Sequence, residues 1–184
     1  MMEDLERPNV LPELEAFLEG VGLSREQLDW CEGKELPEPA HGLLVHNRDM
    51  TSALQRHHGE AITLEVRRTL NRDGRYFREV VLRGEESGAP VEYGAIEIML
   101  DRFPEGLSKE IVRGRMPLGG ILNRHGYPYR SAPLGYFRVP GGSVRAIFPD
   151  APGGEMSFGR YNQLLSAEDE VLAMIIEILP PRKI

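Results

Sequence analysis

Residues 62–82 read ITLEVRRTLNRDGRYFREVVL, two segments of alternating apolar and polar residues separated by turn residues. Alternation with a period of two is typical of half-buried strands, and the turn residues Asn71-Arg72-Asp73-Gly74 favour a short connection between them. A third segment of this kind, PVEYGAIEIML, follows at residues 90–100 after a Gly/Ser turn. Because parallel strands need long crossover connections, these short loops predict an antiparallel meander.

Helical patterns lie on both sides of this meander. Asp49-Met50-Thr51 predicts the start of a helix that runs to about His58, with Gly59 as its stop signal. Residues 105–124 predict two helical pieces, divided at Gly114 and Pro117.

Further strands are expected towards the end of the chain. One lies near Tyr136–Val139, and two more follow over SFGRYNQLLS (157–166) and VLAMIIEILPP (171–181), joined by the turn Ala-Glu-Asp-Glu. Strands grouped together, with helices clustered between them, predict an α+β fold in a single domain over residues 1–184.

Residues 1–42 are predicted to form an N-terminal helical and linker extension. Apolar residues recur at helical spacing over residues 11–30, with a break at residues 20–22. Ser24 and Gln27 have the spacing of a capping box, which predicts a second short helix. Residues 32–42 are rich in Pro, Glu and Gly, which is typical of a linker.

The overall charge and the apolar runs exclude several classes of function. The chain has 184 residues and a formal net charge of −7, without a run of Lys or Arg, which argues against a nucleic-acid partner. Cys31 is the only cysteine, so neither an intramolecular disulfide nor a CxxC metal site is expected. The N-terminus lacks signal-peptide features, and the apolar run VLAMIIEIL is short and contains Glu177. These features predict a cytoplasmic protein without a membrane span.

Three charged residues interrupt apolar patterns. Arg68 and Arg78 share the apolar faces of their strands, and Glu177 lies in a final strand that is apolar on both faces. A lone buried charge costs several kcal/mol, so it needs a partner or a ligand. The pattern leaves open a structural Arg–Glu ion pair, charges that reach solvent at a strand end, or an anion-binding cavity. Glu97 is a weaker anomaly of the same kind, for which a structural role is favoured.

Two familiar kinds of site are not supported. Gly114 and Gly119 have the spacing of a phosphate-binding loop, but Gly120 and Ile121 follow where a lysine and a hydroxyl residue are needed. The five histidines do not form a metal-ligand set, because His57 and His58 point about 100° apart on a helix and the others are scattered. We therefore predict neither a mononucleotide site nor a histidine metal site.

Several segments, taken in order, resemble the chorismate lyase family, the chorismate–pyruvate lyases of ubiquinone biosynthesis. They are LLVHNRDMTSALQRHHG, RYFREVVL, GRMPLGGIL, SFGRYNQLLS and IIEILPP, and the resemblance covers roughly residues 43–181. It implies a single antiparallel sheet of about six strands, with helices on one side and helical flaps over an enclosed ligand site. It also implies a cofactor-independent enzyme that eliminates pyruvate from chorismate and leaves 4-hydroxybenzoate.

The resemblance also implies roles for individual residues. Arg78 matches the arginine that holds the ring carboxylate, and Glu177 matches the acid of the final strand, as a general base or as an anchor for the C4 hydroxyl. Met50 and Leu118 match contacts made through the backbone. Arg68 and Arg115 are further candidates for the enolpyruvyl carboxylate.

Alternatives to the lyase reaction stay open. Residues 127–154 look longer and richer in glycine than the corresponding family segment, which points to a remodelled pocket. Such a pocket would suit an enzyme acting on another ring acid or biosynthetic intermediate. It would equally suit a non-catalytic small-molecule binder, since effector domains of one group of bacterial transcription regulators share this architecture. The sequence does not determine the oligomeric state.

Overall fold

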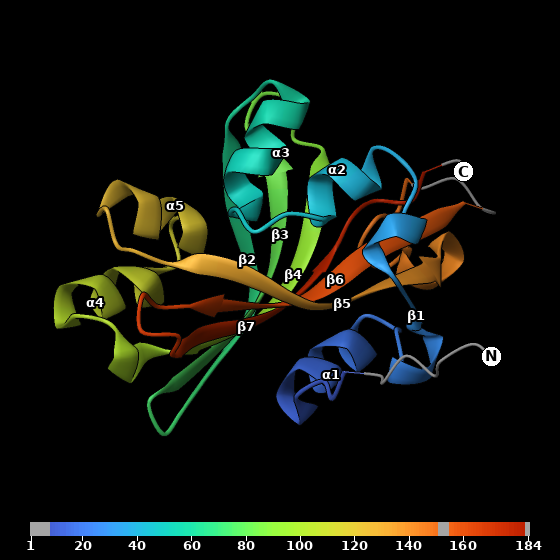
Figure 1. Cartoon of the computed structure of the whole chain (residues 1–184). Coiled ribbons are helices and arrows are strands. Elements are labelled where there is room, and N and C mark those ends of the chain that lie inside the picture. Colours follow the sequence, from blue (N-terminus) through green and yellow to red (C-terminus); the bar gives the residue numbers. More distant parts are fainter. Residues whose placement is uncertain (1–7, 151–154, 183–184) are drawn as a thin grey trace.

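A computed structural model describes residues 8–150 and 155–182 and shows one antiparallel sheet flanked by helices (Figure 1). The sheet has seven strands in the order β1-β5-β6-β7-β4-β3-β2. The strands are β1 (Asp29–Cys31), β2 (Ile62–Arg72), β3 (Arg75–Gly84), β4 (Pro90–Met99), β5 (Arg130–Pro140), β6 (Met156–Leu165) and β7 (Val171–Ile178). In the described part of the chain, no helix is long and apolar enough to cross a membrane.

The meander predicted from residues 62–100 is present. Strands β2 and β3 pair from Ile62↔Gly84 to Arg72↔Arg75, and β3 pairs with β4 over Arg75–Arg83. Asp73 and Gly74 form the hairpin turn with φ values of 52° and 78°. Two consecutive positive φ values define the turn whose twist matches that of the flanking strands.

Within residues 8–150 and 155–182, five α-helices flank the sheet: α1 (Pro12–Gly20), α2 (Ala40–Leu44), α3 (Met50–His58), α4 (Glu105–Arg113) and α5 (Leu118–Arg124). Helix α3 begins as predicted, because the Asp49 side chain accepts a hydrogen bond from Ser52 N (2.7 Å), and it ends at Gly59 with φ 72°. The two helical pieces divide as predicted: Gly114 is the C-cap of α4, with a positive φ, and Pro117 is the N-cap of α5.

The α+β class with one antiparallel sheet is confirmed, with two differences from expectation. The sheet has seven strands instead of about six, because residues 29–31 add an edge strand beside β5. The helices also lie on both sides of the sheet: α1 covers one face, while α2 to α5 lie over the other (Figure 1). Strand β5 is longer than the predicted segment, and α2 lies partly within the predicted linker.

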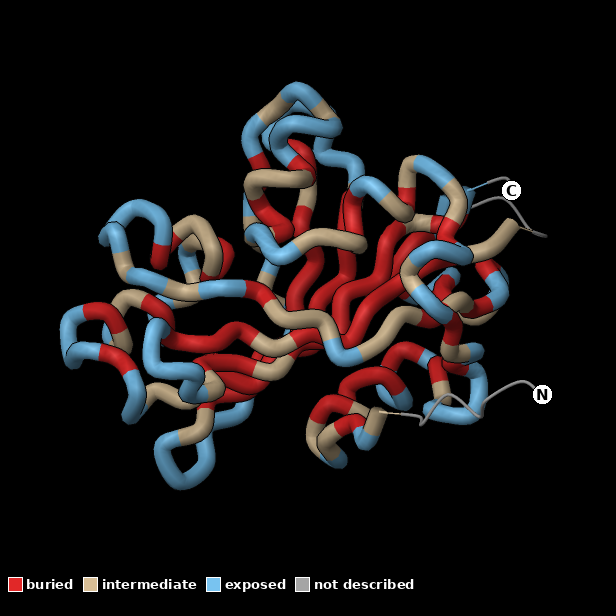
Figure 2. The backbone as a smooth tube through the Cα atoms, viewed as in Figure 1, coloured by how far each residue is buried: buried red, intermediate tan, exposed pale blue. Residues whose placement is uncertain are grey.

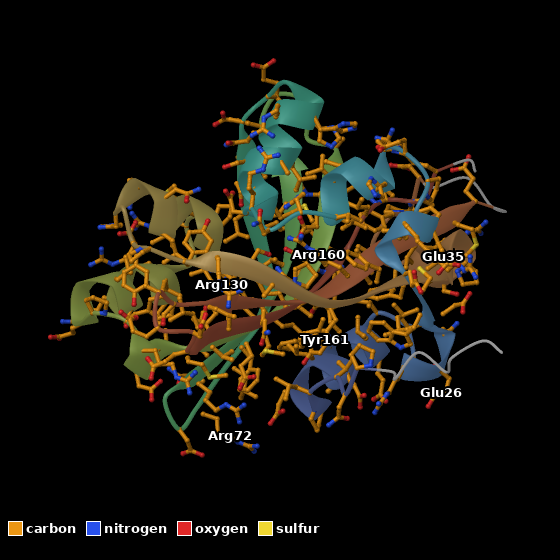
Figure 3. The ribbon with its side chains drawn as sticks, in the orientation of Figure 1. Glu26, Glu35, Arg72, Arg130, Arg160 and Tyr161 are labelled. Atoms are coloured by element: carbon orange, nitrogen blue, oxygen red, sulfur yellow. The ribbon has the colours of Figure 1, made fainter. Side chains whose placement is uncertain are left out.

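The face under α1 carries a large cluster of buried apolar side chains, and the buried parts of the sheet lie at the centre of the molecule (Figure 2). Leu14, Phe17 and Leu18 of α1 are buried against Phe77 and Tyr93 of the sheet. Consecutive strand residues alternate between the two faces, so Arg160 and Tyr161 of β6 point in opposite directions (Figure 3). Arg160 points to the side of α3 and α5, which we call the flap helices, and Tyr161 points towards α1. The face that carries Arg160 is the one that contains a cavity.

Candidate ligand-binding site

The floor of the cavity consists of side chains in neighbouring rows across four strands. Across one row, Val80 of β3 lies opposite Gly94, Gly94 opposite Glu177, and Glu177 opposite Arg160. The next row contains Arg78, Ile96, Ile175 and Asn162 in the same strand order. Because side chains with a spacing of two share a face, polar and apolar groups from four strands meet under the helices.

The roof comes from the N-terminal ends of two helices. Met50 and Thr51 of α3 and Leu118 and Gly119 of α5 line the cavity from above. Asp49 links the two helices, because its Oδ1 caps the N-terminal end of α3 and its Oδ2 accepts a hydrogen bond from Asn123 Nδ2 in the last turn of α5 (3.2 Å). The space enclosed is about 60 Å³. One water needs only about 10–15 Å³, so there is room for a larger group.

Arg78 is the most unusual side chain in this cavity. It is 2% exposed, and its Nε and Nη1 atoms have no hydrogen-bond partner among the described residues. No carboxylate of the described chain forms an ion pair with it. Burial lowers the pKa of Arg78 to about 10, since removal from water disfavours the charged form. At neutral pH the interior therefore holds a cation that requires a counter-anion.

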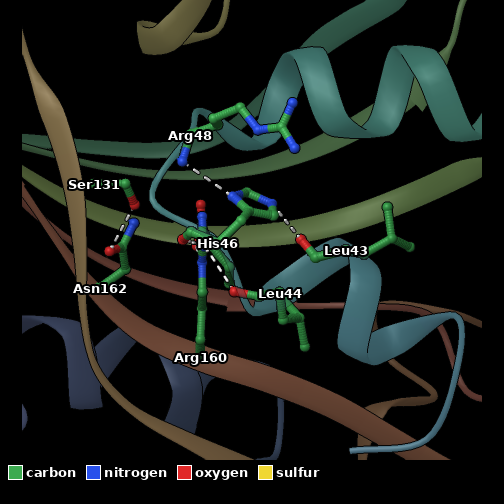
Figure 4. A network of polar contacts seen from close by, with 8 residues as sticks. Leu43, Leu44, His46, Arg48, Ser131, Arg160 and Asn162 are labelled. Atoms are coloured by element: carbon green, nitrogen blue, oxygen red, sulfur yellow. Dashed lines mark hydrogen bonds and ion pairs between the residues drawn. The ribbon is translucent and has the colours of Figure 1, made fainter. Parts of the chain in front are cut away.

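Arg160 and Glu177 form a buried ion pair beside Arg78. The Arg160 Nε donates to Glu177 Oε2, and the two side chains are 0% and 5% exposed. Arg160 Nη1 also donates to the carbonyl oxygens of Leu44 (2.9 Å) and His46 (3.3 Å), which ties β6 to the segment between α2 and α3 (Figure 4). Arg160 Nη2 has no partner in the described chain and is available to a ligand.

Asn162 and Glu92 complete the polar lining. Asn162 Oδ1 accepts a hydrogen bond from Ser131 Oγ (2.9 Å), which leaves its Nδ2 without a described partner (Figure 4). Glu92 is 3% exposed, and its Oε2 also has no described partner. Burial, together with the nearby charge of Glu177, raises the pKa of Glu92 well above its ordinary value.

Four of the six site residues expected from the sequence lie together. Arg78, Glu177, Met50 and Leu118 all line this one cavity. Met50 and Leu118 are 5% and 4% exposed, so the flap helices present buried surfaces to the sheet. These four residues come from separate segments of the sequence and lie around one cavity in the structure.

Arg68 and Arg115 do not join them, contrary to expectation. A bulge between Val66 and Arg68 shifts the register of β2, so Arg68 lies opposite Glu79 and forms an ion pair with it on the α1 face. Arg68 Nη2 also donates to the carbonyl of Phe17 (3.0 Å). Arg115 is exposed in the turn between α4 and α5.

Arg160, Glu92 and Asn162 were not identified from the sequence. The period-two pattern that singled out Arg78 also applies to them, since Arg160 and Asn162 share a strand face with Phe158 and Leu164. Glu97, for which a structural role was favoured, lies on the α1 face and forms an ion pair with Arg75.

No protein-family model matches the sequence, and no curated protein shows significant similarity to it. Among solved structures, the chain is similar to PhnF from Mycobacterium smegmatis, with a TM-score of 0.53 and 15% identity over 72% of this chain and 63% of that chain. It is also similar to the effector domain of PhnF from Mycobacterium smegmatis, with a TM-score of 0.54 and 15% identity over 72% of this chain and 88% of that domain. The likeness confirms the expected fold class, and at this identity it shows the fold alone.

Proposed function

We propose that this chain binds a small organic anion, a ring carboxylate, in the cavity between the sheet and the flap helices. The observation that carries the proposal is Arg78, a buried guanidinium without a carboxylate partner in the described chain. A carboxylate on a ligand would supply two parallel acceptors for this guanidinium and remove the cost of its burial. Arg160 Nη2 and Asn162 Nδ2 offer two further donors in the same space.

The comparison with solved structures supports a binding role. The similar structures include a domain described as an effector domain, and this chain spans most of that domain. The chain spans 63% of the length of the PhnF structure. A protein that binds a ring acid without converting it is therefore our first choice.

Calorimetry with 4-hydroxybenzoate as the probe tests this function. We expect saturable binding by the wild type and a loss of affinity of about 100-fold or more in Arg78→Met, because a buried carboxylate would lose its charged partner. Arg115→Met is the matched control, since it removes an exposed arginine outside the cavity. Equal affinity in the wild type and Arg78→Met, or no binding by the wild type, would exclude the proposal.

A second candidate function is the elimination of pyruvate from chorismate. Glu177 favours it, because this carboxylate lines the same cavity as Arg78 and only its Oε2 forms a hydrogen bond within the described chain. In this reaction the ether bond at ring C3 breaks and the ring loses its C4 proton and becomes aromatic. The departing enolpyruvyl group takes up a proton as pyruvate. The protein would mainly position the substrate and exclude water.

Glu177 would serve this reaction either as the base for the C4 proton or as an anchor for the C4 hydroxyl, and we favour the anchor. Incubation of the protein with chorismate, with release of pyruvate followed by a coupled assay, tests the activity. A Glu177→Gln variant that kept most of its kcat would exclude proton abstraction by this carboxylate. Binding of 4-hydroxybenzoate without release of pyruvate would leave the binding function alone.

A further inference from the structure

Glu92 is a buried acid in the cavity that neither proposed function uses. Its side chain points from β4 to the same face as Gly94 and lines the cavity with Arg78 and Glu177. It forms neither an ion pair nor a side-chain hydrogen bond within residues 8–150 and 155–182, and its Oε2 is buried without a partner. A carboxylate in such a place needs a ligand or a proton.

The surrounding charges do not neutralise Glu92. The charged side chains that line the cavity with it are Arg48, Asp49, Arg78, Arg160 and Glu177. Arg160, the cation whose charge acts on Glu92, is already paired with Glu177 and with two carbonyl oxygens. Burial and the charge of Arg160 lower the pKa of the nearby His46, which favours the neutral form of its ring. Burial and Glu177 both favour the protonated form of Glu92.

Glu92 and Glu177 are close enough to act on one ligand group. Glu177 lies directly opposite Gly94, and Glu92 lies two residues from Gly94 along β4, so the two acids are diagonal neighbours on one face of the sheet. Diagonal neighbours have Cα atoms about 7–8 Å apart, within reach of long side chains. Gly94 places no side chain between them and itself lines the cavity. The Glu92 Oε1 atom lies 3.8 Å from the position that a Cβ of residue 94 would take, so the Glu92 carboxyl reaches over Gly94.

We propose that Glu92 and Glu177 together recognise a hydroxyl group on the ligand, at the end opposite the carboxylate held by Arg78. Glu177, paired with Arg160, accepts a hydrogen bond from the hydroxyl proton. Glu92, as a neutral carboxylic acid, donates a hydrogen bond to the hydroxyl oxygen. A buried acid that is kept neutral near pH 7 can serve as a donor in this way. The inference rests on the proposed function and narrows the ligand class to hydroxylated ring carboxylates.

Three probe ligands test separately the hydrogen bond that the hydroxyl donates to Glu177 and the one that it accepts from Glu92. The hydroxyl of 4-hydroxybenzoate both donates and accepts, the ether oxygen of 4-methoxybenzoate only accepts, and benzoate does neither. We expect wild-type affinity to fall about tenfold from 4-hydroxybenzoate to benzoate, because a buried polar group then loses its partner. We expect 4-methoxybenzoate to bind more weakly than 4-hydroxybenzoate, because it cannot donate to Glu177.

Two variants and a pH series test the role of Glu92, with affinities measured by calorimetry. Glu92→Gln keeps a neutral donor and should preserve the preference for 4-hydroxybenzoate over benzoate at every pH. Glu92→Leu removes the donor. It should reduce the difference in binding free energy between 4-hydroxybenzoate and benzoate to about half of the wild-type value or less. Wild-type affinity for 4-hydroxybenzoate should fall as the pH rises through the raised pKa of Glu92, because Glu92 then loses its proton.

These outcomes distinguish a failure of this inference from a failure of the proposed function on which it rests. If the wild type binds none of the three acids, the proposed function fails and the inference fails with it. If it binds 4-hydroxybenzoate and benzoate equally, or if Glu92→Leu retains the full preference, only the inference fails. Loss of binding in a folded Glu92→Gln would show that an ionised Glu92 is required and would exclude neutral Glu92 as the donor. The wild-type pH series tests whether Glu92 binds the ligand in its neutral form even if Glu92→Leu does not fold.

Discussion

Arg160 and Glu177 lie directly opposite each other on β6 and β7 and form an ion pair on the floor of the cavity. The guanidinium also donates to the carbonyl oxygens of Leu44 and His46, so one side chain connects the sheet to the segment that leads into α3. The pair therefore holds the position of Glu177 and, through the backbone, the start of a flap helix. Its contribution to stability should be separable from ligand binding.

Arg160→Met should lower the free energy of unfolding by about 3–5 kcal/mol, because it leaves Glu177 buried without its partner. Urea denaturation without ligand measures the change. The control is Arg130→Ala, which removes a pair with Asp169 whose side chains are 52% and 70% exposed. Exposed pairs contribute about 0–1 kcal/mol. A loss of less than about 1 kcal/mol in Arg160→Met would contradict the structural role of the pair.

Arg78→Met should have the opposite effect on the protein without ligand. The wild-type guanidinium is buried with two unpartnered nitrogen atoms, so an apolar side chain of similar length should raise the free energy of unfolding by on the order of 1–3 kcal/mol. The same variant should lose the thermal stabilisation that 4-hydroxybenzoate gives to the wild type. If the variant is instead strongly destabilised, Arg78 has a structural partner and does not mark a ligand site.

Arg68→Ala should weaken the attachment of α1 and leave ligand binding unchanged. Arg68 pairs with the buried Glu79, donates to the Phe17 carbonyl and lies 5.0 Å from the Phe17 ring centroid. Its loss leaves Glu79 with only the Tyr93 hydroxyl as a partner, at an expected cost of about 1–3 kcal/mol. Hydrogen exchange should become faster over residues 12–20. An unchanged exchange rate with reduced affinity for 4-hydroxybenzoate would place Arg68 in ligand binding after all.

Arg68 and Arg78 show why only part of the site was predictable. Strict alternation places both on apolar faces, and for Arg78 this reasoning holds because β3 pairs regularly with its neighbours around that residue. In β2 a single bulge before Arg68 reverses the face of the residues that follow. A bulge depends on the pairing of two strands, so one strand's sequence does not reveal it.

The fold was more predictable than the site because hairpin turns and helix caps are local signals. Asp73-Gly74 and Asp49 act within a few residues of themselves, and both formed as expected. Strand β1 depends on pairing between Trp30 and Phe137, residues far apart in the chain, and was missed. Glu92 was missed for a related reason, because its place beside Arg78, Arg160 and Glu177 follows only from the order of strands β3, β4, β7 and β6.

Glu92→Gln should change the pH dependence of stability. The folded state raises the pKa of Glu92 above its ordinary value of 4.5, so the native protein binds more protons than the unfolded chain above about that pH. The stability that protonated Glu92 contributes to the wild type is therefore fully present below the unfolded pKa. It falls as the pH rises towards the folded pKa, by at most about 1.4 kcal/mol per pH unit for one proton.

The variant cannot lose this proton, so the difference in unfolding free energy between Glu92→Gln and the wild type should grow in favour of the variant between about pH 4.5 and neutral pH. Denaturation curves at several pH values measure it, and taking the difference removes the contributions of other titrating groups such as His46. Parallel curves for the two proteins would show that Glu92 keeps an ordinary pKa.

Gly94→Ala tests whether the open floor of the cavity is needed for binding. Gly94 lies between Val80 and Glu177 in the central row, and a methyl group there would lie 3.0 Å from Val80 Cγ2 and 3.8 Å from Glu92 Oε1. The backbone of Gly94 does not have a positive φ, so alanine is compatible with the strand, and Val80 must move by only a few tenths of an ångström.

We therefore expect a folded Gly94→Ala protein whose affinity for 4-hydroxybenzoate falls about tenfold or more, because the methyl group lies between Glu92 and Glu177. Gly106→Ala is the matched control, since a methyl group at that position in α4 would have no described atom within 4 Å beyond its chain neighbours and the backbone of its own helix, and its affinity should equal that of the wild type. Calorimetry on both variants, with far-ultraviolet circular dichroism to verify folding, provides the comparison. Undiminished affinity in a folded Gly94→Ala would mean that the ligand does not lie between Glu92 and Glu177.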